Sequence, residues 1–129
     1  MKLDHIGIAT KDATELAETY SRLFDDLDIV HHEEYNDMHV VFIELDTGYF
    51  EVLEPIDMDS PIGSYLADND HPLHHVAFEV DDIEAELSRL QHMNITLLDE
   101  TPREGAWGHT IAFIHPSETG RVLTELVEH

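Results

Sequence analysis

Two histidines and two glutamates recur at matching places in the chain. His5 and His75 lie 70 positions apart, and Glu51 and Glu125 lie 74 positions apart. Each histidine falls in a similar short segment. Each glutamate lies in a later strand-like run of the same half, with hydrophobic residues two positions away on either side. An ionised carboxylate among apolar side chains needs a partner, and one metal ion satisfies two carboxylates and two imidazoles together. The sequence therefore predicts a metal site built from His5, Glu51, His75 and Glu125.

The donor set narrows the choice of metal and of chemistry. The chain has no cysteine, so the ligands are two imidazole nitrogens and two carboxylate oxygens. Such a set suits Co²⁺, Mn²⁺, Ni²⁺, Fe²⁺ or Zn²⁺, with Co²⁺ as our first choice, and it leaves two octahedral positions for water or substrate. Two histidines with a single carboxylate would indicate an oxygenase, and Glu51 as a fourth ligand weighs against that. We expect Lewis-acid chemistry on a carbonyl group.

The same repeat predicts the elements that position these side chains. Each histidine segment is followed by a charged pair that ends in Asp, at 11–12 and at 81–82, and then by an amphipathic helical pattern. In the second half Asp81 or Asp82 is expected to cap the helix. Three strand-like runs follow each helix: they lie at 28–32, 39–45 and 49–53 in the first half and at 96–99, 109–114 and 122–127 in the second. A hairpin turn is predicted at 46–48, and a short helix from Ser60-Pro61 through Leu66.

The predicted architecture is α+β, with two tandem βαβββ modules that form a cupped mixed sheet. We expect a single domain over residues 1–129, with module 1 at about 1–56, a connecting short helix at about 57–70 and module 2 at about 71–129. Because side chains alternate along a strand, His5 shares a face with Gly7, and His75 shares one with Ala77. These small neighbours leave room beside each imidazole.

The charge balance excludes one class of function and suggests an environment. Six Lys and Arg stand against 29 Asp and Glu, giving a net charge of −23. Nucleic-acid binding needs a basic surface, so it is excluded. The acidic residues are spread along the chain, which indicates a halophilic protein whose charges are screened by a Debye length of ~3 Å at 1 M salt. No long apolar run is present, so we expect a cytoplasmic protein with no membrane partner.

Several segments resemble the vicinal oxygen chelate (glyoxalase/bleomycin-resistance) superfamily and, within it, the methylmalonyl-CoA epimerases. The resemblance covers nearly the whole chain. It rests on residues 3–9, 51–55, 59–62, 73–83 and 115–126. The Ser60-Pro61-Ile62 segment and the ending His115-Pro116, Thr119-Gly120 and Glu125-Leu126 are the parts most specific to the epimerases.

The resemblance implies a reaction and roles. It places the metal ligands on His5, Glu51, His75 and Glu125, where some members have Gln in place of Glu51. The implied reaction interconverts (R)- and (S)-methylmalonyl-CoA by metal-assisted removal of the C2 proton through an enolate. Glu125 is the candidate for one base, and Glu51 or a water-linked group for the other. An acyl-CoA substrate and a homodimer are also implied.

The sequence departs from the family pattern at two places. An acidic residue implicated as a base in some members aligns with Val40, and Trp107 stands at a usually small position of the loop at 105–108. Arg103 and Arg121 are candidates for contacting CoA phosphates or the substrate carboxylate. Three strand-end histidines could line the cup: His39, His109 and His115.

Two other functions remain open at this point. A glyoxalase I-type lactoylglutathione lyase has the same His, Glu, His, Glu order, so the ligands alone do not discriminate, whereas the middle and C-terminal segments favour the epimerase. A metal-free small-molecule-binding module of the same fold would not need all four ligands.

Overall fold

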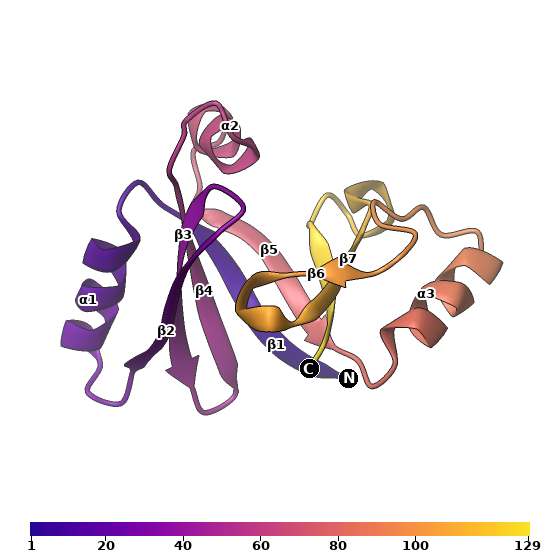
Figure 1. Ribbon diagram of the computed structural model, residues 1–129, viewed down its shortest axis with the longest axis horizontal. Helices are drawn as coiled ribbons and strands as arrows, with labels where there is room; N and C mark the ends of the chain where they lie inside the picture. The colour runs from indigo at the N-terminus through magenta and orange to yellow at the C-terminus, as the bar shows by residue number, and fades with distance from the viewer. The chain divides into compact units, whose positions relative to one another are not determined.

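A computed structural model describes residues 1–129 and contains three α-helices and eight β-strands. Figure 1 shows its ribbon. In chain order the elements are β1 (Lys2–Ala9), α1 (Ala13–Leu23), β2 (Asp28–Tyr35), β3 (Met38–Leu45), β4 (Gly48–Pro55), α2 (Pro61–Asp68), β5 (Leu73–Glu79), α3 (Ile83–His92), β6 (Arg103–Glu104), β7 (Thr110–Ile114) and β8 (Thr124–Glu128). Two short 3₁₀ turns, Ala106–Gly108 and Pro116–Glu118, flank β7. The α+β class and the βαβββ order of each half are as predicted.

The chain forms two compact units, which we describe separately. The first unit is His5–His74, and the second combines Met1–Asp4 with His75–His129. In the first unit the strand order is β2-β3-β4-β1, with β1 parallel to β4 and the other neighbours antiparallel. The predicted hairpin turn is confirmed, because Leu45 pairs with Gly48 across it. The short helix α2 begins after Ser60, as predicted, and continues two residues past Leu66.

Helix α1 covers one face of the first unit's strands. Ala13 and Ala17 pack against Val41, Ile43 and Val52, all of which are buried. The small alanines let the helix backbone lie close to the sheet, and the apolar area removed from water stabilises the contact. The residues between these positions, among them Glu51, face the other way.

The second unit repeats the arrangement with strand order β5-β8-β7-β6. Strand β5 runs parallel to β8, and β7 is antiparallel to both β8 and β6. Helix α3 covers one face through three buried residues that pack against the sheet. The cluster consists of Ile83, Leu87, Leu90, Ala112, Ile114 and Leu126.

The predicted strand at 96–99 is wrong. Only Leu97 forms an isolated bridge, with Ile114, and the strand beside β7 is the two-residue β6. The reason is local: the Asp99 carboxylate accepts a hydrogen bond of 2.8 Å from the backbone N–H of Phe113. A side chain thereby takes the place that a backbone carbonyl would fill in a regular ladder.

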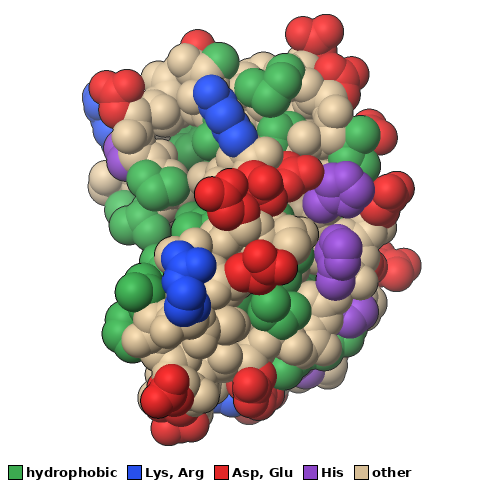
Figure 2. Space-filling view, turned by 90° about the vertical axis from the view of Figure 1, so that its left-hand side faces the viewer, with side chains coloured by type: hydrophobic (Ala, Val, Ile, Leu, Met, Phe, Trp, Pro, Cys, Tyr) green, Lys and Arg blue, Asp and Glu red, His purple; other side chains and the backbone are tan.

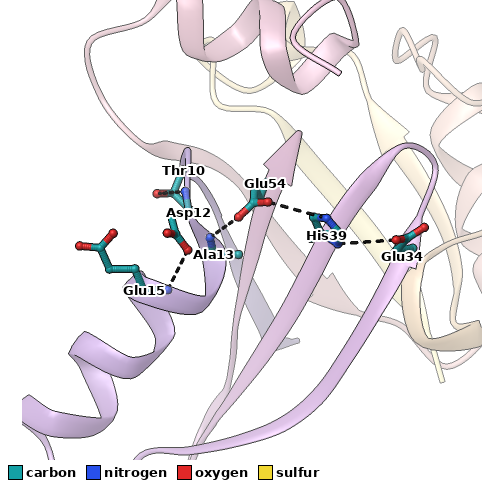
Figure 3. Close-up of polar contacts among 7 residues, drawn as sticks. All are labelled: Thr10, Asp12, Ala13, Glu15, Glu34, His39 and Glu54. Atoms are coloured by element: carbon teal, nitrogen blue, oxygen red, sulfur yellow. Dashed lines mark hydrogen bonds and ion pairs between the residues drawn. The ribbon is translucent and has the colours of Figure 1, made fainter. Parts of the chain in front are cut away.

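The repeat extends to the way each helix begins. Asp12 and Asp82 are the N-caps, the second being one of the two candidates expected for its helix, and each accepts a hydrogen bond of 3.0 Å from the backbone N–H three residues later. A second carboxylate reaches each helix from the last strand of its module. Glu54 accepts from the N–H of Ala13, and Glu128 accepts from that of Ile83, both at 2.8 Å (Figure 3 shows the first).

These strand carboxylates fix each helix to its sheet. Glu54 lies three residues after Glu51, and Glu128 lies three residues after Glu125. Because an odd spacing places two side chains on opposite faces of a strand, one face holds the helix and the other carries the candidate ligand. Sequence reasoning missed this contact, although the spacing of three in both halves was visible.

No helix is both long enough and apolar enough to cross a membrane.

Replacing Glu54 or Glu128 with Ala should lower the free energy of unfolding by about 1–2 kcal/mol each, because a helix N–H loses its acceptor. Glu54→Gln should cost less, since its amide oxygen still accepts. Urea denaturation at constant salt measures the changes. Glu18→Ala, an exposed position on α1, is the control and should change stability by less than about 0.5 kcal/mol. Equal losses for Glu54→Ala and Glu18→Ala would contradict the prediction.

Candidate metal centre

Two of the four predicted ligands meet in the first unit. His5 lies on β1 and Glu51 on β4, and the imidazole Nε2 is 2.9 Å from Glu51 Oε2. Both residues are buried, with exposed fractions of 2% and 8%. Gly7 is the register partner of Glu51 on β1, so the neighbour that faces the carboxylate has no side chain. The room predicted beside His5 therefore lies next to Glu51.

The other two ligands meet in the second unit by the same construction. His75 on β5 and Glu125 on β8 are each 4% exposed, and the distance from His75 Nε2 to Glu125 Oε2 is 3.6 Å. Ala77 is the register partner of Glu125, as Gly7 is of Glu51. Each unit thus presents one buried imidazole beside one buried carboxylate, with a small residue on the histidine strand opposite the carboxylate.

A phenylalanine completes each pair, and sequence reasoning missed both. Phe42 is the register partner of Glu51 on β3, and Phe113 is that of Glu125 on β7. The Phe42 ring meets the His5 ring edge to face at 6.2 Å, and the Phe113 ring meets that of His75 at 5.7 Å. These contacts fix the plane of each imidazole. A shared aromatic residue in the third strand of each module was the available signal.

The residues of the two pairs fit a divalent cation. Adjacent ligands at about 2.1 Å from a metal lie about 3.0 Å apart at a right angle, and the two N···O distances of 2.9 and 3.6 Å are close to that value. Buried polar or charged residues are few, and the four predicted ligands are most of them: Asp4, His5, Glu51, His75, Thr124 and Glu125.

His74 is adjacent to a predicted ligand in sequence but is held in a different way. Its ring meets that of Tyr65 on α2 edge to face at 4.8 Å. Burial lowers the pKa of His74, and the nearby charge of Glu51 raises it by a smaller amount, so the imidazole is neutral at pH 7. The Tyr65 hydroxyl donates a hydrogen bond of 2.5 Å to the Leu73 carbonyl and fixes this corner of the unit.

His39 was a candidate to line the cup because it lies at a strand end, but it does not share the face of Glu51. It is the register partner of Glu54, on the face that α1 covers, and its ring nitrogens lie 3.9 Å from Glu54 and 4.0 Å from Glu34 (Figure 3). His115 has a local role instead, since its Nδ1 accepts a hydrogen bond from the Ser117 N–H at the start of a 3₁₀ turn.

Of the two candidate arginines, Arg103 lies beside the second pair. Its guanidinium carbon is 5.6 Å from the centre of the Phe113 ring, which itself contacts His75. Its Nε lies 3.2 Å from Asp99 Oδ1. A cation over an aromatic face is attracted by the ring quadrupole, and the ion pair fixes its orientation. Arg121 lies in an exposed turn with a positive φ of 70°.

The fold agrees with the comparisons with known proteins. The chain belongs to the Glyoxalase/Bleomycin resistance protein/Dioxygenase superfamily, whose model matches residues 4–113. This confirms the superfamily that the sequence motifs indicated.

Relatives within that superfamily match nearly the whole chain. It is 35% identical to the mitochondrial methylmalonyl-CoA epimerase of Dictyostelium discoideum, covering 98% of this chain and 78% of the relative. It is 32% identical to an ethylmalonyl-CoA/methylmalonyl-CoA epimerase of Cereibacter sphaeroides, covering 97% and 96%. A Streptomyces coelicolor methylmalonyl-CoA epimerase variant, solved with 2-nitronate-propionyl-CoA, superimposes with a TM-score of 0.92 at 31% identity and covers 99% and 94%.

Because Phe42 is only 1% exposed, Phe42→Ala should lower the free energy of unfolding by about 3–5 kcal/mol, and Phe42→Leu by roughly 1–2 kcal/mol. Chemical denaturation followed by far-UV circular dichroism measures both. Phe24→Ala serves as the control, since that ring is half exposed, and it should cost less than about 1 kcal/mol. A Phe42→Ala protein as stable as the Phe24→Ala control would contradict the assignment of Phe42 to the core behind Glu51.

Proposed function

We propose that this chain is a methylmalonyl-CoA epimerase, which interconverts the (R) and (S) forms at C2. The observation that carries the proposal is the pair of buried His–Glu contacts, built identically in both units on register positions beside Gly7 and Ala77. The relatives that match the chain from end to end, and that are named for this reaction, support it.

We further propose that His5, Glu51, His75 and Glu125 hold one divalent cation. Their chemistry suits Co²⁺, with Mn²⁺, Ni²⁺, Zn²⁺ and Fe²⁺ as alternatives. When bound, such an ion stabilises the negative charge that develops on a thioester oxygen as the neighbouring carbon loses a proton. The phenylalanines hold the imidazole planes, so that little reorganisation is needed on binding.

The chain's own carboxylates are proposed to move the proton. Glu125 accepts it from C2 while the electron pair of the C–H bond delocalises into the thioester carbonyl. Return of a proton from the opposite side inverts the centre, and Glu51 is the candidate for this second role. Val40 supports that choice, because the position where some family members carry an acid is here a fully buried apolar residue on the face of Glu51.

Arg103 is the proposed contact for an anionic part of the acyl-CoA substrate. Its guanidinium lies over the Phe113 ring, and that ring contacts His75. The ion pair with Asp99 fixes its orientation. The protein is further proposed to act as a homodimer in the cytoplasm.

The metal assignment predicts the effect of removing single ligands. His75→Ala and Glu125→Ala should lose stoichiometric metal and epimerase activity while the far-UV circular dichroism stays folded. Metal content after dialysis and exchange of the C2 proton in heavy water are the measurements, with a hemithioacetal substrate as the test for the lyase alternative. His92→Ala, an exposed position at the end of α3, is the matched control.

Glu51→Gln separates the two proposed roles of that residue. The amide keeps an oxygen ligand, so metal should stay bound with a modest loss of affinity. If exchange of the C2 proton nevertheless stops, Glu51 is a base as well as a ligand. An active, metal-free His75→Ala enzyme would overturn the metal assignment.

The net charge predicts a salt response. Figure 2 shows acidic side chains at many places over one face and basic side chains at few, in keeping with a net charge of −23. Self-repulsion destabilises the fold, and the anionic substrate is repelled at low salt. The melting temperature and kcat/KM for methylmalonyl-CoA should both rise steeply between ~0.1 and ~2 M KCl, where the Debye length falls from ~10 Å to below ~3 Å. Sucrose at matched osmolality, which does not screen charge, is the control. A flat or falling response in both quantities would contradict the halophilic interpretation.

A further inference from the structure

A second cluster of potential metal ligands lies within the second unit, apart from the His75–Glu125 pair. It consists of Asp4 on β1, Glu79 at the end of β5 and His129 after the end of β8, and we refer to it as the Asp4 cluster. The imidazole and carboxylate ligand atoms of these three residues all lie within 4.8 Å of one another. Asp4 is only 3% exposed, and His129 Nε2 is in direct contact with its Oδ1.

The periodicity of the strands separates this cluster from the His75–Glu125 pair. Along β8 the face that carries Glu125 continues to His129, four residues on, and along β5 the face that carries His75 continues to Glu79. Four residues of strand span about 13 Å. An apolar layer lies between the two polar ones and consists of Ala77, Ile111 and Val127. The Asp4 cluster is therefore a separate polar layer.

The chemistry of the cluster is that of a cation site. Asp4 and Glu79 are two carboxylates held near each other, and one of them is buried. Like charges so placed repel unless cations compensate them, and the His129 imidazole already contacts Asp4. Lys2 compensates part of the charge of Glu79, because its Nζ lies 3.2 Å from Glu79 Oε2, but the Lys2 side chain is 69% exposed. His109 adds a second imidazole, whose ring centre lies 4.1 Å from that of His129.

We propose that Asp4, Glu79 and His129 bind a second divalent cation of the Zn²⁺ class, with His109 placed to supply a fourth ligand. Tetrahedral ligands about 2.1 Å from an ion lie about 3.4 Å apart, so the most widely separated ligand atoms need to approach by little more than 1 Å, while the His129–Asp4 contact lengthens. Mixed imidazole and carboxylate donors favour Zn²⁺, Co²⁺ or Ni²⁺ over Mg²⁺ or Ca²⁺. The ion would join β1 to the ends of β5 and β8, which makes it a structural site. It does not depend on the proposed epimerase activity.

The only tryptophan of the chain reports on this site. The Trp107 ring lies 5.7 Å from that of His109, so a Co²⁺ ion in the Asp4 cluster should quench its fluorescence. The titration uses Co²⁺ alone and the His75→Ala variant, in which the other proposed site is disabled. We expect saturable quenching with one equivalent of Co²⁺ and a rise in melting temperature of roughly 5–10 °C at saturation.

Matched variants decide the outcome. In the same background His129→Ala and Glu79→Gln should each weaken Co²⁺ binding about 100-fold or more, while His92→Ala should leave it unchanged. Both altered residues are partly or fully accessible, and if one variant fails to fold the other still tests the site. Quenching that survives in His129→Ala and Glu79→Gln alike, or a His75→Ala protein that binds no Co²⁺, would overturn the proposal. Neither readout uses the substrate, so an inactive epimerase would not affect the result.

Discussion

The burial of one carboxylate in the last strand of each module is the constraint on which the rest of the structure depends. Glu51 and Glu125 are 8% and 4% exposed, and a charge so far from water is costly unless something nearby compensates it. Each module meets this need in the same way, with an imidazole from its first strand, a small residue two positions further along that strand, and an aromatic ring from the strand on the other side of the carboxylate. The positions of His5, Gly7 and Phe42, and of their counterparts in the second unit, follow from that need.

The opposite face of the same strands holds the helices α1 and α3. Glu54 and Glu128 reach the first N–H groups of α1 and α3, where a helix presents donors that have no partner of their own. A negative charge at this end is also favoured by the helix dipole. One strand therefore carries two carboxylates three residues apart, one for the candidate ion and one for the helix. A shift of register by one residue would exchange these faces and destroy both contacts.

The features of the fold and the site that could be predicted from the sequence are those marked by a pattern that is either repeated in both halves or local to one element. His5, Glu51, His75 and Glu125 were found because a duplication displays them twice. The cap of the second helix was narrowed to Asp81 or Asp82 because a cap lies next to its helix. Phe42 and Phe113 were missed because their contacts run across strands whose register the sequence does not reveal. The strand at 96–99 was wrong because Asp99 takes the place of a backbone acceptor. The Asp4 cluster joins the two ends of the chain, and no local pattern indicates that they meet.

The carboxylates of this protein fall into two physical classes. Most contribute to the net charge of −23 from exposed positions, where mobile counterions within a Debye length screen them. Glu51 and Glu125, and to a similar degree Asp4, lie where mobile ions do not reach, so concentrated salt cannot replace a partner fixed in place. Salt and bound metal therefore act on different carboxylates. A protein solvated by acidic residues still needs imidazoles, backbone donors or a coordinated cation wherever an acid is buried, and it is at those positions that its two modules are most alike.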